Sequence, residues 1–322
     1  MTTSKPKLHW CWPEALNEAP ELGDRLAQRF DLIVSTALPV LGDHVQFLVP
    51  RLDHEVNAAF IESQPSLRII ATPSTGTDHI DVDAASRANI SIVSLKHELE
   101  FLDSVQSTAE QAWLLILACA RRFREAVAQP LAGGWSAMDV RGSELYGKTI
   151  GIVGCGRLGS MVVRFAQAFR MRVLVTDVRC IRLANVEQVD LPILLAQADI
   201  VSIHVHLTDR TCGLIGATQL AFMKRGAVLV NTSRGAVIDE TALLAAIQSG
   251  HLGAAGLDVL CGESRIGRDS HPLVEASKTN PRLVITPHVG GCTVEAQAKA
   301  FNHFAGLLIK TTHALNVTGV AI

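Results

Sequence analysis

The sequence predicts an α/β protein with two doubly wound parallel sheets, one in each of two domains. Short apolar runs alternate with helical stretches along most of the chain, as in strands joined by helices. The series restarts once, at the segment KTIGIVGCGRLG. With 322 residues, 48% of them hydrophobic and 19% charged, the chain can form two globular cores. We therefore expect two Rossmann-like or flavodoxin-like domains, the first of residues 1–103 plus 292–322 and the second of residues 104–291.

The first domain is expected to contain five strands separated in part by helices. Helical spacers are expected at residues 21–30 and 55–63. The predicted strands are KLHWCW, FDLIVST, QFLVP, LRIIATP and NISIVSL. This alternation favours parallel packing, because parallel strands need a crossover between them.

Two further helices are expected outside these strands. A long helix is predicted over residues 104–129, with Asp103 or Ser104 as its cap and Pro130 at its end. A last helix is predicted over residues 293–312.

The second domain is expected to contain six strands. They are TIGIVG, RVLVTD, ADIVSIHV, GAVLVNTS, GAAGLDVL and RLVITPHV. Continuous apolar strands rich in Val and Ile are typical of a parallel sheet that helices cover on both faces.

Composition excludes several classes of protein. The net charge is −2 and the 29 basic residues are scattered, which argues against a nucleic-acid partner. The longest apolar run, AWLLILACA, is too short to span a membrane, and the first residues lack the apolar stretch of a secretory signal. The seven cysteines occur singly, and His79, His204 and His206 lack ligand spacing, so neither a disulfide framework nor a metal site is expected. A cytoplasmic location is expected.

A glycine motif follows the first strand of the second domain. Gly154 would permit a tight turn, Gly156 would let the backbone approach a pyrophosphate, and Gly159 would let the next helix pack on the strand. Such a motif is weak by itself, because a merely glycine-rich turn looks the same. Its place between a predicted strand and a predicted helix favours a dinucleotide site.

Asp177, at the end of the next strand, strengthens this interpretation. An acidic side chain there can accept hydrogen bonds from the ribose hydroxyls of adenosine and would repel a 2′-phosphate, which favours NAD over NADP. Arg179 and Arg182 could soften that repulsion, or could be solvated loop charges.

Three later strands each end in polar residues, at the edge where ligands bind in open α/β sheets. The segments are NTSRG with Arg234, GLDVLCGES with Asp258 and Glu263, and ITPHVGG with His288. Each residue taken alone also has an ordinary structural explanation. Arg234 could form a surface ion pair and Asp258 could cap a helix, whereas Glu263 could be a solvated loop charge and His288 a structural histidine.

Together these motifs resemble the D-isomer-specific 2-hydroxyacid dehydrogenase family, which includes phosphoglycerate, glycerate and D-lactate dehydrogenases. The resemblance runs from about residue 69 to residue 298. The matching stretches, in order, are STGTDHID, STAEQAWLLILACAR, GKTIGIVGCGRLG, ADIVSIHVHLTDRTCGLIG, MKRGAVLVNTSRGAVIDETAL, GAAGLDVLCGE and TPHVGG.

The resemblance implies a site in a cleft between a substrate-binding domain and an NAD-binding domain, closed by a hinge. It implies Arg234, Glu263 and His288 as catalytic residues, and homodimerisation through residues 120–146. It implies that the amides of Thr75, Gly76 and Thr77 bind the substrate carboxylate. The implied cofactor-binding residues are Gly154, Gly156, Arg157, Leu158, Gly159, Asp177, His204, Thr232, Asp258 and Gly290, with Asp258 orienting the nicotinamide carboxamide.

The chemistry of hydride transfer requires these residue types. Reduction of a ketone builds negative charge on its oxygen, so a nearby acid must protonate it, and His288 would be that acid. Glu263 would stabilise the imidazolium form of His288. Arg234 would hold the substrate carboxylate or carbonyl with its planar guanidinium.

The chain departs from the family pattern at several positions. Ser264 stands where proline usually follows the glutamate, His206 replaces the proline of HxPLT, and Ser74 stands where glycine is common. The segment SLKHELEFLDS is charged where the family usually has a neutral loop, so Lys96 and His97 could bind a second anionic group of the substrate. The alternative is a solvated loop.

Other functions stay open on this scaffold. Formate dehydrogenases place glutamine where Glu263 stands, which argues against formate, whereas phosphite oxidation uses Arg, Glu and His as well. A non-catalytic, NAD-sensing interaction protein would also retain the fold.

Overall fold

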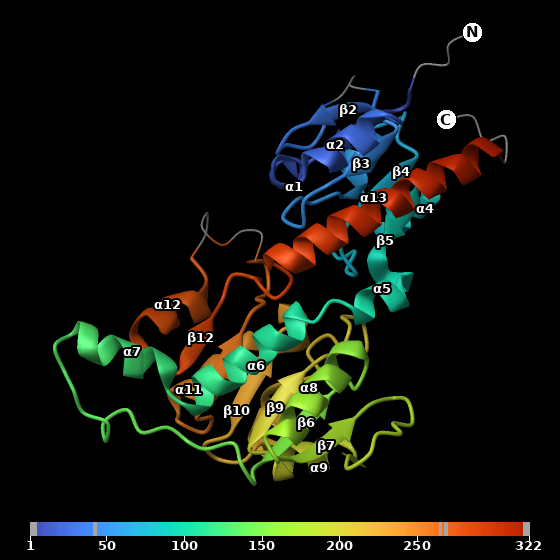
Figure 1. The fold of residues 1–322 in the computed structure, drawn as a ribbon. Coiled ribbons are helices and arrows are strands. Elements are labelled where there is room, and N and C mark those ends of the chain that lie inside the picture. Colours follow the sequence, from blue (N-terminus) through green and yellow to red (C-terminus); the bar gives the residue numbers. More distant parts are fainter. Residues whose placement is uncertain (1–4, 41–43, 264–265, 267–269, 318–322) are drawn as a thin grey trace. The chain divides into compact units, whose positions relative to one another are not determined.

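The computed structural model of the protein describes residues 5–40, 44–263, 266 and 270–317, with side chains described up to residue 312. It divides into two compact units. We call Met1–Val105 with Val294–Ile322 the small unit, and Gln106–Thr293 the large unit (Figure 1). Ser264, which departs from the family pattern, lies outside the described residues.

The small unit contains a five-stranded sheet in the order β2-β1-β3-β4-β5, with every pairing parallel. All five strands lie within the predicted apolar runs. Their bounds are β1 Lys7–Trp10, β2 Asp31–Val34, β3 Phe47–Val49, β4 Ile69–Thr72 and β5 Ser91–Ser94. This strand order is the flavodoxin-like one, so the predicted fold class of this part is confirmed.

Helices cover both faces of this sheet because successive strand residues point to opposite sides. Phe47 and Val49 pack with one buried cluster, whereas Leu48 packs with the other. The first cluster includes residues of α1 (Pro13–Glu18), α2 (Pro20–Ala27), α5 (Leu99–Asp103) and α13 (Val294–Val317). The second includes residues of α3 (Ala58–Glu62) and α4 (Val82–Arg87). A short 3-10 helix, η1 (Leu95–His97), follows β5.

The large unit contains a seven-stranded sheet in the order β12-β11-β10-β9-β6-β7-β8, again parallel throughout. Six of these strands are the predicted ones. The bounds are β6 Thr149–Val153, β7 Arg172–Thr176, β8 Glu187–Gln188, β9 Ile200–Ile203, β10 Val228–Asn231, β11 Ala254–Leu257 and β12 Leu283–Ile285. The order reverses between β6 and β9, as in Rossmann sheets.

Two buried clusters lie on the two faces of this sheet. Val228 and Val230 belong to one and Leu229 to the other, which is the alternation that a doubly covered sheet requires. On the first face lie α6 (Ser107–Ala120) and α8 (Arg157–Ala168) (Figure 1). The other cluster includes residues of α9 (Leu191–Gln197), α10 (Ala217–Phe222), α11 (Glu240–Gln248) and α12 (Pro272–Thr279). A 3-10 helix, η2 (Gly235–Val237), follows β10.

The expectation of one long helix over residues 104–129 is wrong. The chain forms α6 and then α7 (Phe123–Leu131), with Arg122 between them in the left-handed conformation, φ +50°. The Arg122 guanidinium donates to the Glu125 carboxylate and, at 2.9 Å, to the Asp139 carbonyl oxygen. These hydrogen bonds stabilise the break between α6 and α7 at Arg122. Local helix propensity could not predict the break, because Asp139 is distant from Arg122 in the sequence.

The expected ends of that helix are wrong as well. Asp103 ends α5 and Ser104 follows it, so neither caps α6, which begins at Ser107. Pro130 lies inside the last turn of α7 rather than beyond it. The closing helix, α13, begins at Val294, close to the predicted start.

Several small elements were not predicted, among them β8, α1, α4, α5, η1 and η2. Strand β8 has two exposed polar residues and so no apolar run that could identify it. Helices α1 and α4 are six residues each. For α4 a signal was present, because the Asp81 carboxylate accepts a hydrogen bond from the Ala84 amide at 2.8 Å as an N-cap.

Within the described residues, no helix combines the length and the apolar character that crossing a membrane requires.

The close packing of α8 on β6 generates a stability prediction. A Cβ added at Gly159 would lie 2.1 Å from the Gly154 carbonyl oxygen, whereas a Cβ at Gly23, inside α2, would meet nothing within 4 Å. Gly159→Ala should therefore lower the free energy of unfolding by about 1–3 kcal/mol. Gly23→Ala should raise it by about 0.5–1 kcal/mol, because alanine loses less entropy in a helix. Chemical denaturation followed by circular dichroism measures both, and effects of the same sign would contradict the packing argument.

Candidate active site

The predicted site residues of the large unit follow the carboxyl ends of its parallel strands. The strand order reverses between β6 and β9, and in open α/β sheets ligands bind outside the carboxyl ends of the strands at such a reversal. Gly154 follows β6, Asp177 follows β7, His204 follows β9, Thr232 follows β10, Asp258 follows β11 and Thr286 follows β12.

The glycine loop between β6 and α8 has the backbone that its sequence requires. Gly154 has φ +87°, and a Cβ there would lie 2.7 Å from the His204 carbonyl oxygen. A Cβ at Gly156 would meet only the Arg179 guanidinium, at 3.7 Å, so the backbone there is open to a ligand. Arg157 and Leu158 begin α8, whose first amides have no partner within the helix. The loop thus fits the diphosphate of a dinucleotide.

Asp177 is held by the same loop. Its carboxylate accepts hydrogen bonds from the Cys155 amide at 2.8 Å and from the Arg179 amide at 2.9 Å. The Arg179 guanidinium also pairs with it, at 3.1 Å. Burial by itself raises the pKa of Asp177, but the hydrogen bonds from Arg179 and Cys155 outweigh this and hold the pKa below its usual value.

Arg179 was expected either to offset the charge of Asp177 or to be a solvated loop charge, and in the structure it pairs with Asp177. Arg179 and Arg182 both line a hollow of about 310 Å³ beside Gly156. Within the described residues, Arg182 makes no ion pair. An acceptor for ribose hydroxyls is therefore present, and Arg179 offsets part of its charge.

Two buried polar atoms at the carboxyl edge of the sheet lack hydrogen-bond partners among the described residues, namely Thr232 Oγ1, just after β10, and His204 Nδ1, just after β9. His204 Nε2 lies 2.8 Å from Ser202 Oγ. Burial lowers the pKa of His204 to about 4, so its ring is neutral near pH 7. Buried polar atoms of this kind need a partner, and a bound dinucleotide would supply one.

His288 and Glu263 form a hydrogen-bonded pair. His288 Nδ1 lies 2.5 Å from Glu263 Oε1, and the two side chains are about one-third exposed, at 33% and 39%. Glu263 Oε2 also accepts from the Leu260 amide at 3.3 Å. Because Nδ1 is used in this pair, the other ring nitrogen, Nε2, is left to exchange a proton with a substrate.

Arg234 is positioned by the loop between β10 and η2. Asn231, buried at the end of β10, donates to the Arg234 carbonyl oxygen at 2.9 Å, and Arg234 donates to the Ser233 carbonyl oxygen at 2.7 Å. A Cβ at Gly235 would lie 2.1 Å from the carbonyl carbon of Leu260. The Arg234 loop therefore packs directly on the segment that leads to Glu263.

Asp258 organises the segment that carries His288, a role that the sequence did not reveal. Its side chain is buried, and it accepts from the Thr286 hydroxyl at 2.5 Å, the Val289 amide at 3.0 Å and the Gly290 amide at 2.8 Å. His288 itself has φ +53°, a conformation that non-glycine residues rarely adopt. The Asp258 network holds this backbone, and Gly290 is required because a Cβ there would lie 2.9 Å from the carboxylate.

The predicted substrate residues of the small unit share one edge of its sheet. Thr75, Gly76 and Thr77 follow β4. The Ser74 carbonyl oxygen accepts a hydrogen bond from the Leu95 amide at 3.0 Å, and the Ser74 hydroxyl donates to the Gly76 carbonyl oxygen at 2.6 Å. Among the described residues, the amides at positions 75–77 make no backbone hydrogen bond. Lys96 and His97 are exposed and lie in η1. The hydrogen bond from the Leu95 amide to Ser74 connects η1 to the loop after β4. Ser74 therefore braces the loop where glycine is common.

Comparison with known proteins places the chain in a family. Residues 113–290 match the family model described as D-isomer specific 2-hydroxyacid dehydrogenase, NAD binding domain. The chain belongs to the D-isomer-specific 2-hydroxyacid dehydrogenase family. The resemblance seen in the sequence is confirmed, and NAD is the cofactor of this domain.

Two curated relatives are each 38% identical to this chain. The D-3-phosphoglycerate dehydrogenase of Mycobacterium leprae matches 284 residues, which are 87% of this chain and 52% of that protein. The hydroxypyruvate reductase of Thermotoga maritima matches 256 residues, 79% of this chain and 81% of that protein. The chain thus spans about half the length of the first of these relatives.

A solved structure supports the fold alone, because its identity is low. The D-lactate dehydrogenase of Aquifex aeolicus, complexed with NAD and lactic acid, superposes with a TM-score of 0.84 at 24% identity, covering 95% of each chain.

The Asp258 network generates a second prediction. Asp258→Asn places an amide nitrogen among three donors, so it should cost about 2–3 kcal/mol of unfolding free energy. It should also loosen residues 286–290, seen as faster amide hydrogen exchange there. Asp239→Asn is the matched control, because Asp239 caps α11 through one bond to the Ala242 amide and asparagine caps equally well. Unchanged exchange at 286–290 in Asp258→Asn would rule out the positioning role.

Proposed function

We propose that this chain is an oxidoreductase that transfers a hydride between NAD(H) and a small 2-hydroxy acid or its 2-oxo acid, with D specificity. The single observation that carries this proposal is the His288–Glu263 pair, 2.5 Å apart, at the strand edge that also holds the glycine loop. A proton donor beside a dinucleotide site is what reduction of a carbonyl requires.

Each residue of the pair has a defined task in the proposed reaction. Nicotinamide, when bound, supplies or accepts the hydride. His288 gives a proton from Nε2 to the carbonyl oxygen in reduction and takes it back in oxidation. Glu263 holds Nδ1 and stabilises the imidazolium form before the transfer. Glu263 also supports a proton-coupled reaction over oxidation of formate, which releases no hydroxyl proton.

The substrate anion is proposed to bind Arg234 and the loop after β4. The guanidinium of Arg234 forms a charge-assisted fork with a carboxylate or carbonyl group. The amides of Thr75, Gly76 and Thr77 are available for the other carboxylate oxygen, and their neighbours Lys96 and His97 are proposed to recognise a second anionic group.

A second copy of the chain is the proposed partner, through residues 120–146. Large apolar side chains in this segment are exposed, which is unusual for a surface that stays in water. They include Phe123, Leu131, Trp135 and Met138, with Trp135 92% exposed. All seven cysteines are free thiols, which fits the proposed cytoplasmic location.

A panel assay tests the proposed function. NADH oxidation should occur with at least one of glyoxylate, hydroxypyruvate and pyruvate, whereas NAD reduction by phosphite or formate should be absent. His288→Asn should lower kcat by about 10²–10⁴-fold, because the proton donor is lost. Glu263→Gln should lower it as well, whereas Glu187→Gln, an exposed partner of Arg172, should not. Binding of NADH without turnover of any panel member would instead favour an NAD-sensing protein.

Lys96 tests the substrate class. Lys96→Ala should raise KM by about tenfold for 2-oxo acids that carry an additional phosphate or phosphonate group, because an ion pair is lost. The KM for mono-anionic 2-oxo acids should stay unchanged. Lys278→Ala, which removes an exposed lysine of α12 in the large unit, is the control. An equal loss with both kinds of substrate argues against a second anionic group while leaving the dehydrogenase proposal intact.

A further inference from the structure

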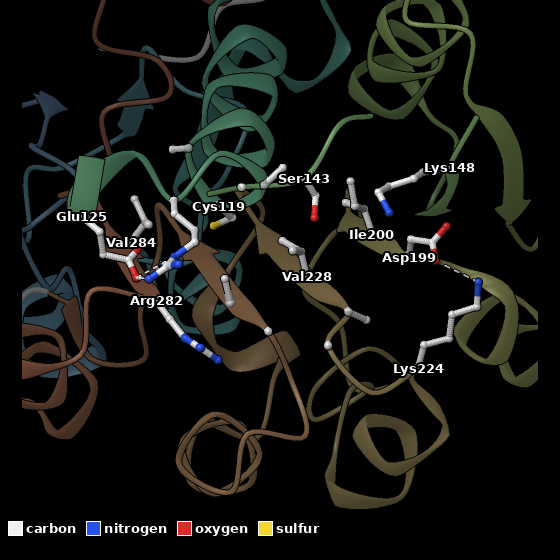
Figure 2. Close-up of a pocket in the computed structure, with 18 of the residues that line it drawn as sticks. Cys119, Glu125, Ser143, Lys148, Asp199, Ile200, Lys224, Val228, Arg282 and Val284 are labelled. Atoms are coloured by element: carbon white, nitrogen blue, oxygen red, sulfur yellow. Dashed lines mark hydrogen bonds and ion pairs between the residues drawn. The ribbon is translucent and has the colours of Figure 1, made fainter. Parts of the chain in front are cut away.

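Ion pairs of the large unit differ in how far water reaches them. At a hollow beside the amino-terminal edge of its sheet, Asp199 pairs with Lys224 at 3.0 Å (Figure 2). Glu125 pairs with Arg122 at 2.7 Å at the same hollow, within the segment that is proposed to contact a second copy of the chain. Each pair has one partner that is more than one-third exposed. These are therefore surface ion pairs, which contribute little to stability.

A third ion pair of the large unit, between Glu240 and His271, is enclosed. Glu240 Oε2 lies 3.2 Å from His271 Nε2, and the two side chains are only 17% and 11% exposed. Among the ion pairs of residues that the structure describes, no other has both partners so little exposed. A carboxylate taken out of water costs free energy unless its oxygens are paired. The groups around Glu240 therefore show what it holds.

The other carboxylate oxygen of Glu240 holds the segment that leads to Glu263. Glu240 Oε1 accepts a hydrogen bond from the Cys261 amide at 2.8 Å, across 21 residues of sequence. Burial and the neighbouring Glu240 carboxylate raise the pKa of the Cys261 thiol to about 11, so the thiol stays protonated and adds no second negative charge. Glu240 thus connects the start of α11 to the segment after β11.

Glu240 is not needed to cap its own helix. Asp239 is the N-cap of α11, and its carboxylate accepts from the Ala242 amide at 3.0 Å. An acid in the first turn also favours the helix dipole, but that effect does not require burial. Because the two oxygens of Glu240 bond to Cys261 and His271 instead, its role is to join segments that are distant in the sequence.

The Cys261 amide is next to the amide that Glu263 holds. Glu263 Oε2 accepts from the Leu260 amide at 3.3 Å, and Gly262, with φ +66°, turns the chain between Cys261 and Glu263. Fixing the Cys261 amide therefore fixes the start of the turn that carries Glu263. Because the Glu263 side chain is itself 39% exposed, its position depends on this backbone more than on burial.

Glu240 also lies on the same connection as Arg234. Strand β10, Arg234, η2 and α11 follow one another along the chain. A Cβ at Gly235 would lie 2.3 Å from the Cys261 nitrogen, so the backbones of these two segments are in direct contact there. The loop of Arg234 and the segment of Glu263 are thus joined at two points, Gly235 and Glu240.

His271 holds the Glu240 carboxylate in this place. Because an ionised carboxylate is only an acceptor, the hydrogen of their bond belongs to His271 Nε2. His271 is the N-cap residue of α12, and the buried Leu273 anchors that helix to the large unit. Without His271, an enclosed oxygen of Glu240 would lose its partner, which costs free energy.

We propose that Glu240 is a positioning residue of the reaction. Through the Cys261 amide it keeps the Glu263 carboxylate against the His288 ring, and His271 keeps Glu240 in place. This inference rests on the proposed function, in which Glu263 stabilises the imidazolium form of His288. A displacement of about 1 Å at such a group costs a large factor in rate, because the stabilisation depends on a short contact.

Steady-state kinetics with the 2-oxo acid that the panel assay identifies tests this role. Glu240→Ala should lower kcat by about tenfold or more, because the Glu263 segment loses its support, while the KM for NADH stays unchanged. Glu240→Gln should recover most of the loss, because its carbonyl oxygen still accepts from the Cys261 amide. The matched control, Asp239→Asn, removes the same charge from the same end of α11 and should leave kcat unchanged. An unchanged kcat in Glu240→Ala would contradict the proposal.

A double variant separates positioning from a general loss of structure. In the Glu263→Gln background, Glu240→Ala should lower kcat no further, because the carboxylate that it positions is already lost. An equal loss in both backgrounds would mean that Glu240 supports the fold as a whole, and would overturn the proposal.

Amide hydrogen exchange keeps the test independent of turnover. The Leu260 amide, which donates to Glu263, should exchange faster in Glu240→Ala than in the unmodified chain, and at the unmodified rate in Asp239→Asn. Unchanged exchange at Leu260 in Glu240→Ala would overturn the positioning role. If the unmodified chain turns over no member of the panel, the dehydrogenase proposal fails, and faster exchange at Leu260 still supports the link from Glu240 to the Glu263 segment.

Discussion

The parallel pairing of the strands in the large unit is the constraint on which its site depends. Because the strands run in one direction, every carboxyl end meets at one edge, and residues far apart in the chain gather there. Gly154, Asp177, Asp258 and the segment of His288 lie at one edge of the sheet for this reason. Isolated strand ends would give only a set of solvated polar side chains.

Within that edge, a buried carboxylate sets the geometry of the reactive pair. Asp258 collects bonds from Thr286, Val289 and Gly290, and so holds His288 in a left-handed backbone that would otherwise cost free energy. Gly235 lets the Arg234 loop reach the segment before Glu263. The left-handed backbone of His288 and the close contact at Gly235 thus both position the catalytic residues proposed above.

The two edges of the sheet differ in what they present. At the carboxyl edge, most donors and acceptors are paired with one another, and the buried atoms Thr232 Oγ1 and His204 Nδ1, which have no partner among the described residues, directly follow β10 and β9. At the other edge, the acids are neutralised and basic side chains remain around a hollow.

The sequence by itself determined the two parallel sheets, the glycine loop and the family, because apolar periodicity and contiguous motifs are local properties of the chain. It could not determine that Arg122 breaks the predicted long helix, since the bond that holds the break reaches Asp139. Nor could it show that Asp258 braces the His288 segment or that cations between Arg122 and Arg282 surround one hollow. Only the tertiary structure decided these, because hydrogen bonds and charges act through space, and distance along the chain does not report distance in the fold.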